Sequence, residues 1–467
     1  MTLHNRLNLI VVTVLLAVVF SGCATPKEDN IENVKLCTYS SEAISFQYPD
    51  WPDIPPKDDE IFLLKSNGSS VFSAGCYLIP STMLVQEMKK NLEAEFDGEY
   101  GYYLLDSNGT KLNAVTRVLY SDYETYTLTV ASIGQPDISF LSSAQRVKRN
   151  LNVQEGVGIM PIPINGDASF LPQACREARE LGAELISWYF FWGGLEDDWT
   201  VADCVMECLS HEGKSVAVMN VIHTNVLGKY PPEYSSFTDQ GFKEGFAEFS
   251  VEFVNRYKPE YYFIGGEVDI YLNMHREEIA AFKEVLDYTY SEIKKASPQT
   301  QVGLVVTYHY AREYDAVDII QTLAPECDIL GYTVHPYEGD FIYSDVSRGL
   351  KYLNEVRDVV PGKPYAIIET GWSSSSLLNS DEDRQAEFVN DFFSFVENGG
   401  AEFVTWFSLH DQGDCSEAAR IHLDATPHLQ LDEAYIEAFE EFMCSPGLKN
   451  SDGSPKEAWY TWKQYLQ

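Results

Sequence analysis

From Gly156 onward, short apolar runs of strand length alternate with longer segments in which apolar residues recur at helical spacing. The predicted strands cover 156–163, 184–191, 215–222, 261–266, 301–307, 329–334, 365–369 and 401–407. The predicted helices cover 171–181, 200–211, 240–257, 277–296, 315–323, 347–359, 381–397 and 434–442. This alternation is typical of parallel strands joined by helical crossovers. Eight strands, with no G-x-G-x-x-G after the first, favour an α/β fold of the closed (β/α)8 barrel type over an open dinucleotide-binding sheet.

The segment 31–150 has a different pattern, which predicts a small α+β domain before the barrel domain of 156–467. Its predicted strands cover 43–48, 70–79, 114–120 and 124–131, its helices cover 81–95 and 138–148, and Asn108-Gly109 forms a turn. The run from Ile44 to Pro49 resembles the start of PsbP-like modules, a resemblance that implies no activity. We interpret this domain as an adaptor or spacer. The alternative is carbohydrate binding through exposed Trp51, Tyr102 or Tyr103.

The amino terminus has the pattern of an export signal. Arg6 precedes an apolar run from Leu7 to Phe20, which is shorter than the ~20 residues that a membrane-spanning helix needs. The following Ser21-Gly22-Cys23 resembles a lipobox, which implies removal of the signal and lipidation of Cys23. We therefore expect residues 1–23 to be the signal, 24–30 to be a polar tether, and the protein to be anchored by lipid on the outer face of the membrane. A plain secretory signal is the alternative.

Charge and cysteine content narrow the possible partners. The formal net charge is −38, which repels phosphate backbones and argues against nucleic-acid binding. Of nine cysteines, eight remain after Cys23, and an even number in an exported chain predicts disulfides whose pairing the sequence leaves open. Cys204 and Cys208 have helical spacing and are expected to face the core. No C-x-x-C or His/Cys cluster predicts a metal site.

Two of the predicted barrel strands stop on a glutamate. Glu267 follows the fourth strand, and Glu369 ends the seventh. The carboxyl ends of barrel strands meet at one rim, where barrel enzymes carry their chemistry. Two carboxyl groups that face each other across a sugar ring are what glycosidic bond cleavage requires. We therefore interpret Glu267 and Glu369 as a catalytic pair, with solvated loop residues as the alternative.

Aromatic and polar residues follow most of the other strands at the same rim. Aromatic rings stack on the C–H faces of sugars, so this pattern predicts a carbohydrate cleft. The predicted substrate-binding residues are Trp188, Trp192, Asn225, Tyr308, His335, Tyr337, Trp372 and Trp406. Trp406 is the expected platform at the cleavage point, and Tyr308 or Tyr337 the expected partner that orients Glu369. For His309 and His335 two interpretations stay open, a ligand at the rim and a histidine of the core.

The arrangement resembles glycoside hydrolase clan A, retaining barrel enzymes whose acid/base glutamate ends strand four and whose nucleophile ends strand seven. The segment from Ile368 to Trp372 is similar to family 17 β-glucanases, and 264–269 with 330–332 is similar to family 53 endo-β-galactanases. The closing segment 447–459 resembles the last turn of many members. Over 156–467 the resemblance implies cleavage of β-linked polysaccharides or oligosaccharides, with Glu369 as nucleophile, Glu267 as acid/base and no cofactor.

The chain departs from the clan immediately before the acid/base position. The clan usually has an asparagine there, which contacts the sugar 2-hydroxyl, whereas this chain has Gly266. Hydrogen bonds to that hydroxyl supply several kcal/mol in the transition state, so their loss predicts a slower enzyme or another substrate, with Asn225 as a candidate replacement. The alternative is a non-catalytic surface lipoprotein that binds carbohydrate or a partner on a degenerate barrel. No H-x-H pattern supports a metal-dependent hydrolase.

Overall fold

In the computed structural model the chain forms two compact units, Met1–Asn150 and Leu151–Gln467. The second unit is described from 154 to 466, except for 194, 196–198, 211–212, 340 and 425–432. The first unit is described at 36–40, 44–49, 61–66, 70–77, 84, 88–90, 92, 94–97, 100–107, 110–121, 124–132, 135–136, 141 and 145–146. The predicted signal, Cys23 and the tether lie outside these residues. Within them, no helix is long and apolar enough to cross a membrane.

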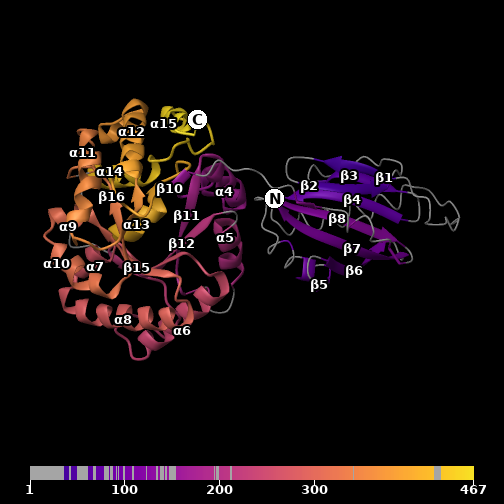
Figure 1. Ribbon diagram of the computed structural model, residues 1–467, viewed down its shortest axis with the longest axis horizontal. Helices are drawn as coiled ribbons and strands as arrows, with labels where there is room; N and C mark the ends of the chain where they lie inside the picture. Colours follow the sequence, from indigo (N-terminus) through magenta and orange to yellow (C-terminus); the bar gives the residue numbers. More distant parts are fainter. Residues whose placement is uncertain are drawn as a thin grey trace. The chain divides into compact units, whose positions relative to one another are not determined.

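The described residues of the first unit form two antiparallel sheets (Figure 1). The larger has the order β3 (Ile61–Ser66), β4 (Ser70–Tyr77), β8 (Glu124–Ser132), β7 (Thr110–Ser121), β6 (Tyr100–Ser107) and β5 (Glu95–Asp97). The smaller joins β1 (Leu36–Ser40), β2 (Ile44–Pro49) and β9 (Gln145–Arg146). The prediction of a helix over 138–148 is therefore wrong for Gln145–Arg146. The backbone of these residues pairs with β2 and not with a preceding helical turn.

The tyrosines considered for carbohydrate binding in the first unit have different environments. The Tyr103 ring packs against a buried cluster that includes Leu84 and Val118, and its hydroxyl lies 2.7 Å from Thr116 Oγ1. Tyr103 is therefore part of the core. Tyr102, next to it in β6, is 42% exposed, and Trp51 lies outside the described residues.

The second unit is a closed barrel of eight parallel strands, which confirms the predicted fold class. In ring order the strands are β10 (Gln154–Ile159), β11 (Ala183–Phe190), β12 (Lys214–His223), β14 (Tyr261–Gly266), β15 (Gln301–Thr307), β16 (Ile329–Val334), β17 (Tyr365–Thr370) and β18 (Val404–Trp406). The first strand closes the ring by pairing with both β11 and β18. A short antiparallel strand, β13 (Val226–Leu227), folds back on β12.

Helices surround the strands of this barrel (Figure 1). The crossover helices are α4 (Leu171–Glu180), α5 (Thr200–Ser210), α6 (Phe242–Tyr257), α8 (Ile279–Ala296), α10 (Val317–Leu323), α11 (Ser347–Glu355) and α12 (Glu382–Asn398). The predicted last helix is α14 (Glu433–Cys444). Four further helices were not predicted: α7 (Val268–Met274), α9 (Tyr308–Glu313), α13 (Ser416–Asp424) and α15 (Glu457–Gln464). Two of them, α7 and α9, begin directly at strand exits.

The barrel interior is filled by apolar side chains that alternate along the strands. This cluster consists of Leu185, Val216, Val218, Phe263, Val305, Ile329, Ala366, Ile368 and Phe403, with Tyr189 and Tyr261 packed against it. Its members identify the inward face of each strand, because successive side chains of a strand point to opposite sides. The barrel interior is therefore a packed core and not a pore.

Two disulfides lie in the described part of the second unit. Cys175–Cys208 joins α4 to α5, and Cys415–Cys444 joins the residue before α13 to the last residue of α14. Cys204 is buried one helical turn from Cys208, as its spacing predicted, but Cys208 also forms a bridge. The pairing that the sequence left open is thus known for four of the cysteines.

Candidate active site

Glu267 stands at the end of β14 in a backbone conformation that side chains rarely adopt. Gly265 has φ +85°, which interrupts the strand alternation, and Glu267 itself has φ 54° and ψ 40°. This left-handed conformation costs a residue with a side chain about 1–2 kcal/mol. It is held by Thr224, whose N–H donates to Gly266 O at 2.8 Å and whose hydroxyl donates to Glu267 Oε2 at 2.7 Å. The neighbouring strand exit thus positions the carboxyl group.

Glu369 reaches the rim because β17 contains an extra residue. Simple alternation would place Ala366 and Ile368 inside the barrel and Glu369 outside. The pairing with β16 shifts between Tyr332 and Thr333, so that Glu369 lies opposite Thr333. Bulges of this kind re-aim side chains next to active sites. The carboxylate is 12% exposed and lies 3.8 Å from His335 Nε2.

The Glu369 carboxylate and the buried surroundings affect the protonation of Glu267. Burial raises the pKa of Glu267, and the nearby charge of Glu369 raises it further, while the Thr224 hydroxyl and His335 partly offset the shift. Glu267 therefore keeps its proton to a higher pH than an ordinary glutamic acid. One protonated and one ionised carboxyl group are the two states that an acid and a nucleophile need.

A third carboxyl group, Asp269, is buried behind this pair. Its Oδ1 accepts the Thr307 N–H at 2.7 Å, and burial raises the pKa of Asp269 well above its usual range, with a further contribution from Glu267. Asp269 therefore keeps its proton to a higher pH than an ordinary aspartic acid.

Tyr189 is the tyrosine that lies beside both glutamates, and the sequence analysis missed it. Burial raises the pKa of Tyr189 well above its usual range, and the charges of Glu369 and Glu267, with a hydrogen bond to Glu369, raise it further. The group is therefore a neutral phenol that donates to the Glu369 carboxylate. The available signal was alternation along β11, which places Tyr189 on the inward face with Leu185.

We expect Tyr189→Phe to reduce kcat about tenfold to a hundredfold, because the Glu369 carboxylate loses a charge-assisted hydrogen bond worth about 1.5–3 kcal/mol. The measurement is the rate of release of a β-linked sugar at saturating substrate. Tyr262→Phe is the matched control, since its hydroxyl bonds Ser250 Oγ at 2.9 Å on the side of β14 that faces α6. Equal losses in the two variants would contradict a specific role for Tyr189.

The tyrosines that were predicted to orient Glu369 have other partners. Tyr308 donates to Glu355 Oε2 at 2.8 Å, and Tyr337 Oη lies 2.8 Å from His309 Nε2. His309 Nδ1 accepts the N–H of His335, so His309 Nε2 carries the proton and donates to Tyr337. Burial, with the nearby His335, lowers the pKa of His309 well below its usual value, so the ring is neutral. His309 is therefore a core histidine, while His335 faces Glu369.

The four tryptophans that were predicted to stack on sugars lie away from the carboxyl pair. Trp192, Trp372 and Trp406 are 6%, 0% and 0% exposed. Trp192 packs among the phenylalanines of α6, Trp372 between Tyr343 and Phe388, and Trp406 against Phe392 and Trp462. Trp188 shares the outer face of β11 with Phe190, whose ring packs 5.2 Å from Phe253. Parallel strands are buried on both faces, and these rings occupy the face toward the helices.

Phe407 is the aromatic residue after β18 that remains partly exposed on the site side. It follows Phe403 and Thr405 in alternation, and Phe403 belongs to the interior cluster. Its ring centroid lies 6.2 Å from that of His335, which contacts Glu369. Phe407 therefore takes the place that was expected for Trp406.

Gly266 leaves space that a neighbouring amide fills. A Cβ at Gly266 would lie 2.7 Å from Asn220 Oδ1 and 3.1 Å from Tyr189 Cε1. Asn220 is 1% exposed, and neither its Oδ1 nor its Nδ2 has a hydrogen-bond partner among the described residues. Asn225, the expected replacement, instead forms hydrogen bonds to His422 through both the nitrogen and the oxygen of its side-chain amide. The amide next to Glu267 thus comes from β12.

Gly266→Asn, which restores the residue usual in the clan, should lower the free energy of unfolding by about 1–3 kcal/mol, because the new side chain overlaps Asn220. Addition of Asn220→Ala to the Gly266→Asn variant should restore most of the lost free energy of unfolding. Denaturant titration of the single and double variants measures both effects. Gly413→Asn is the control, since its φ lies outside the left-handed region and no atom lies closer than 3.7 Å to its Cβ position. Additive losses at positions 266 and 220 would contradict the overlap.

The described residues contain no group of three or more His, Cys, Asp or Glu side chains placed to hold a metal ion.

No model of a known protein family matches the sequence, and no curated protein matches it. Among solved structures, an exo-β-1,4-mannosidase from Opitutaceae bacterium strain TAV5 matches with TM-score 0.50 and 13% identity, over 67% of this chain and 59% of that enzyme. A Streptomyces cattleya glycoside hydrolase of family 5 in complex with Manβ1-4GlcNAc matches with TM-score 0.48 and 14% identity, over 67% and 80% of the two chains. A thermostable xylanase mutant from Cellvibrio japonicus matches with TM-score 0.46 and 12% identity, over 68% and 98%. Because the sequence identity is low, the likeness to the mannosidase shows a shared fold alone, the (β/α)8 barrel.

Proposed function

We propose that this protein is a retaining glycoside hydrolase that cleaves β-linked glycans. The observation that carries the proposal is the pair Glu267 and Glu369 at the exits of the fourth and seventh barrel strands, with the pKa of Glu267 raised by burial and by the charge of Glu369. Two coupled carboxyl groups in different protonation states are the machinery of glycosidic bond cleavage. The shared barrel fold of the Opitutaceae mannosidase supports the same class of reaction.

The first step forms a covalent intermediate. A Glu369 oxygen attacks the anomeric carbon while the bond from this carbon to the leaving oxygen breaks, and Glu267 gives its proton to that oxygen. Tyr189 holds the Glu369 carboxylate in place through its hydroxyl. The ring of Phe407 is the surface next to the pair on which a sugar can stack.

The second step uses the same two residues in exchanged roles. Once Glu369 carries the sugar it has no negative charge, so one of the causes that raise the pKa of Glu267 disappears. Glu267 is then more stable as a carboxylate and takes a proton from water. The water oxygen attacks the anomeric carbon and releases Glu369, with net retention of configuration.

The test is hydrolysis by the full chain of a panel of β-linked mannan, glucan, galactan and xylan oligosaccharides. Proton NMR of the fresh product gives the anomeric configuration before mutarotation. We expect the β-anomer to form first on at least one substrate. The α-anomer as first product would replace double displacement by inversion, and the absence of hydrolysis would reject the enzyme.

A non-catalytic carbohydrate-binding protein is the second candidate, and Gly266 favours it, because the usual amide before the acid/base is missing. Retained binding of one polymer without turnover would establish this function.

Under either function we propose that lipidation at Cys23 anchors the protein at the cell surface. Radiolabelled palmitate incorporation that disappears in Cys23→Ala would support the anchor, and persistence of the label would reject it.

A further inference from the structure

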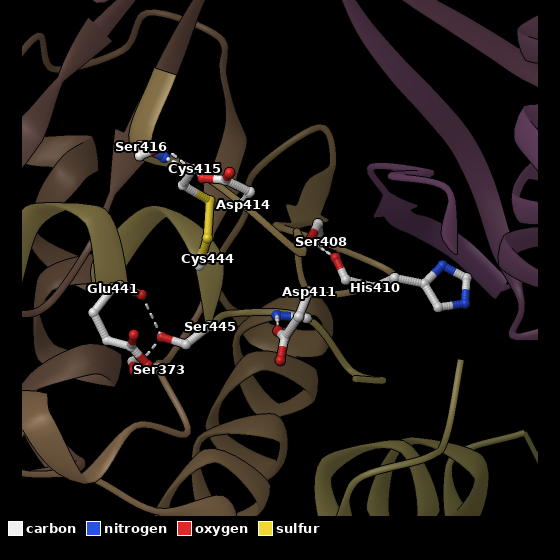
Figure 2. Close-up of a disulfide and its surroundings, with 11 residues drawn as sticks. Ser373, Ser408, His410, Asp411, Asp414, Cys415, Ser416, Glu441, Cys444 and Ser445 are labelled. Atoms are coloured by element: carbon white, nitrogen blue, oxygen red, sulfur yellow. Dashed lines mark hydrogen bonds between the residues drawn. A yellow bond between two sulfur atoms is a disulfide. The ribbon is translucent and has the colours of Figure 1, made fainter. Parts of the chain in front are cut away.

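Two helices that follow the eighth strand form a disulfide-linked pair, which we call the α13–α14 pair and which consists of Ser416–Asp424 and Glu433–Cys444. Cys415 precedes the first helix, and Cys444 is the last residue of the second. The bridge therefore ties the start of one helix to the end of the other (Figure 2). Both outer ends of the pair are fixed at one point of the barrel.

The disulfide end of the pair is attached to the loop that follows Glu369. Ser445, the residue after Cys444, places its hydroxyl 2.6 Å from Ser373 Oγ (Figure 2). The N–H of Ser374 donates to Ser445 O at 3.2 Å. Hydrogen bonds therefore join the loop after β17 to the end of α14.

The first helix reaches the exit of β12. Asn225 Nδ2 donates to His422 O at 2.7 Å, and His422 Nδ1 lies 2.8 Å from Asn225 Oδ1. An amide oxygen only accepts, so His422 Nδ1 carries the proton. The His422 ring centroid lies 5.2 Å from that of His223, the last residue of β12. Two hydrogen bonds thus hold α13 to the third strand exit.

The second helix packs on the exit of β16. The Phe442 ring centroid lies 4.9 Å from that of His335 and 5.1 Å from that of Tyr337. The Phe439 ring lies 5.1 Å from Phe341 and 6.2 Å from His422 of the other helix. Since His335 Nε2 is 3.8 Å from Glu369, only one side chain separates α14 from the carboxyl pair.

These contacts place the pair across part of the barrel mouth. β12 and β16 are the third and sixth strands of the ring, with β14 and β15 between them. Helices that contact both exits, and also the seventh, extend from one side of the mouth to the other. A polymer cleaved at an internal bond needs an open groove on both sides of the carboxyl pair.

We propose, on the basis of the function proposed above, that the α13–α14 pair walls off one side of the site, so that the enzyme removes sugars from the end of a glycan. The Cys415–Cys444 bridge keeps this wall in place. Glu369 and His335, which lie next to this wall, are only 12% and 5% exposed. His422 and Phe442 are the wall residues that contact the rim.

The test compares product patterns on a β-linked hexasaccharide that is a substrate of the full chain and carries a fluorescent tag at its reducing end. The expected pattern is stepwise shortening by one unit. In Cys415→Ser/Cys444→Ser the ratio of internal to terminal cleavage should rise about tenfold, as loss of a ~1.4 kcal/mol barrier predicts. Cys175→Ser/Cys208→Ser is the matched control, because it removes a disulfide between α4 and α5 and should leave the pattern unchanged.

Phe442→Ala tests the wall with both disulfides intact and should move the ratio in the same direction. Internal cleavage by the parent chain would overturn the wall and leave the proposed hydrolase intact. A stepwise pattern in both wall variants, with folding verified by circular dichroism, would overturn the role of the pair. Absence of hydrolysis of every glycan would overturn the proposed function, and the inference with it.

Discussion

Glu369→Gln should reduce glycan hydrolysis by about 10⁴-fold or more, because a neutral amide cannot form the covalent bond to the anomeric carbon. The measurement is the steady-state rate of hydrolysis of the substrate found in the oligosaccharide panel, expressed relative to the rate of the parent chain. Binding of that substrate, measured by calorimetry, should persist, since the amide has nearly the shape of the carboxylate. A loss of turnover without a loss of binding identifies a residue that acts in the chemical step.

The matched control for this variant is Glu260→Gln. Glu260 lies directly before β14, at the opposite end of the strand from Glu267, and accepts the Ser215 N–H at 2.8 Å. The same change of charge there should leave turnover within about threefold of the parent chain. Full turnover in Glu369→Gln would show that Glu369 is not the nucleophile of the reaction.

Glu267→Gln should lose activity in a way that depends on the leaving group. For a glycan the loss should be about 10²–10⁴-fold, the usual contribution of a general acid. For a dinitrophenyl β-glycoside of the same sugar the first step should be nearly unaffected, because this leaving group departs without a proton. The burst of dinitrophenol measured in the first turnover checks the prediction. Equal losses on the two substrates would contradict the assignment of Glu267 as acid.

The decrease of activity at high pH should follow the ionisation of Glu267. The acid must be protonated, so kcat/KM should fall as pH rises through the raised pKa of Glu267. In Glu369→Gln the like charge is gone, and the pKa of Glu267 should move down. Carbon-13 NMR titration of the Glu267 carboxyl group measures this shift without any turnover. An unchanged pKa would show that burial alone, and not Glu369, raises it.

The barrel was predictable because its strands and helices have clear periods. The bounds of β14, β15 and β16 agree with those expected, since Gly, Pro or polar residues interrupt each apolar run at both ends. The last strand, β18, is only Val404–Trp406, although an apolar run over 401–407 was expected to be strand. In the first unit, β9 is a segment of two residues whose pairing with β2 is a tertiary contact, and no local period reports such contacts.

The two glutamates were predictable because strand ends locate them, whereas their neighbours depend on which face a residue occupies. Trp188 and Tyr189 are adjacent, and only the alternation from Leu185 separates an outer tryptophan from an inner tyrosine. The same parity distinguishes Trp406 from Phe407. Glu369 obeys no simple parity, because the bulge opposite Thr333 reverses it. Size and aromaticity alone therefore point to the wrong ring at two strand exits.

The closure of the ring by β10 and β18 has a consequence for the order in which the protein can assemble. Val157 of the first strand pairs with Val404 of the last, so β10 has a free edge until nearly the whole chain has left the ribosome. Free strand edges recruit foreign strands and lead to aggregation. Trp462 of α15 adds a bond to Leu181 O at 2.8 Å, again between the two ends of the unit. Nascent or truncated chains that stop before Val404 therefore leave this edge of β10 without its native partner.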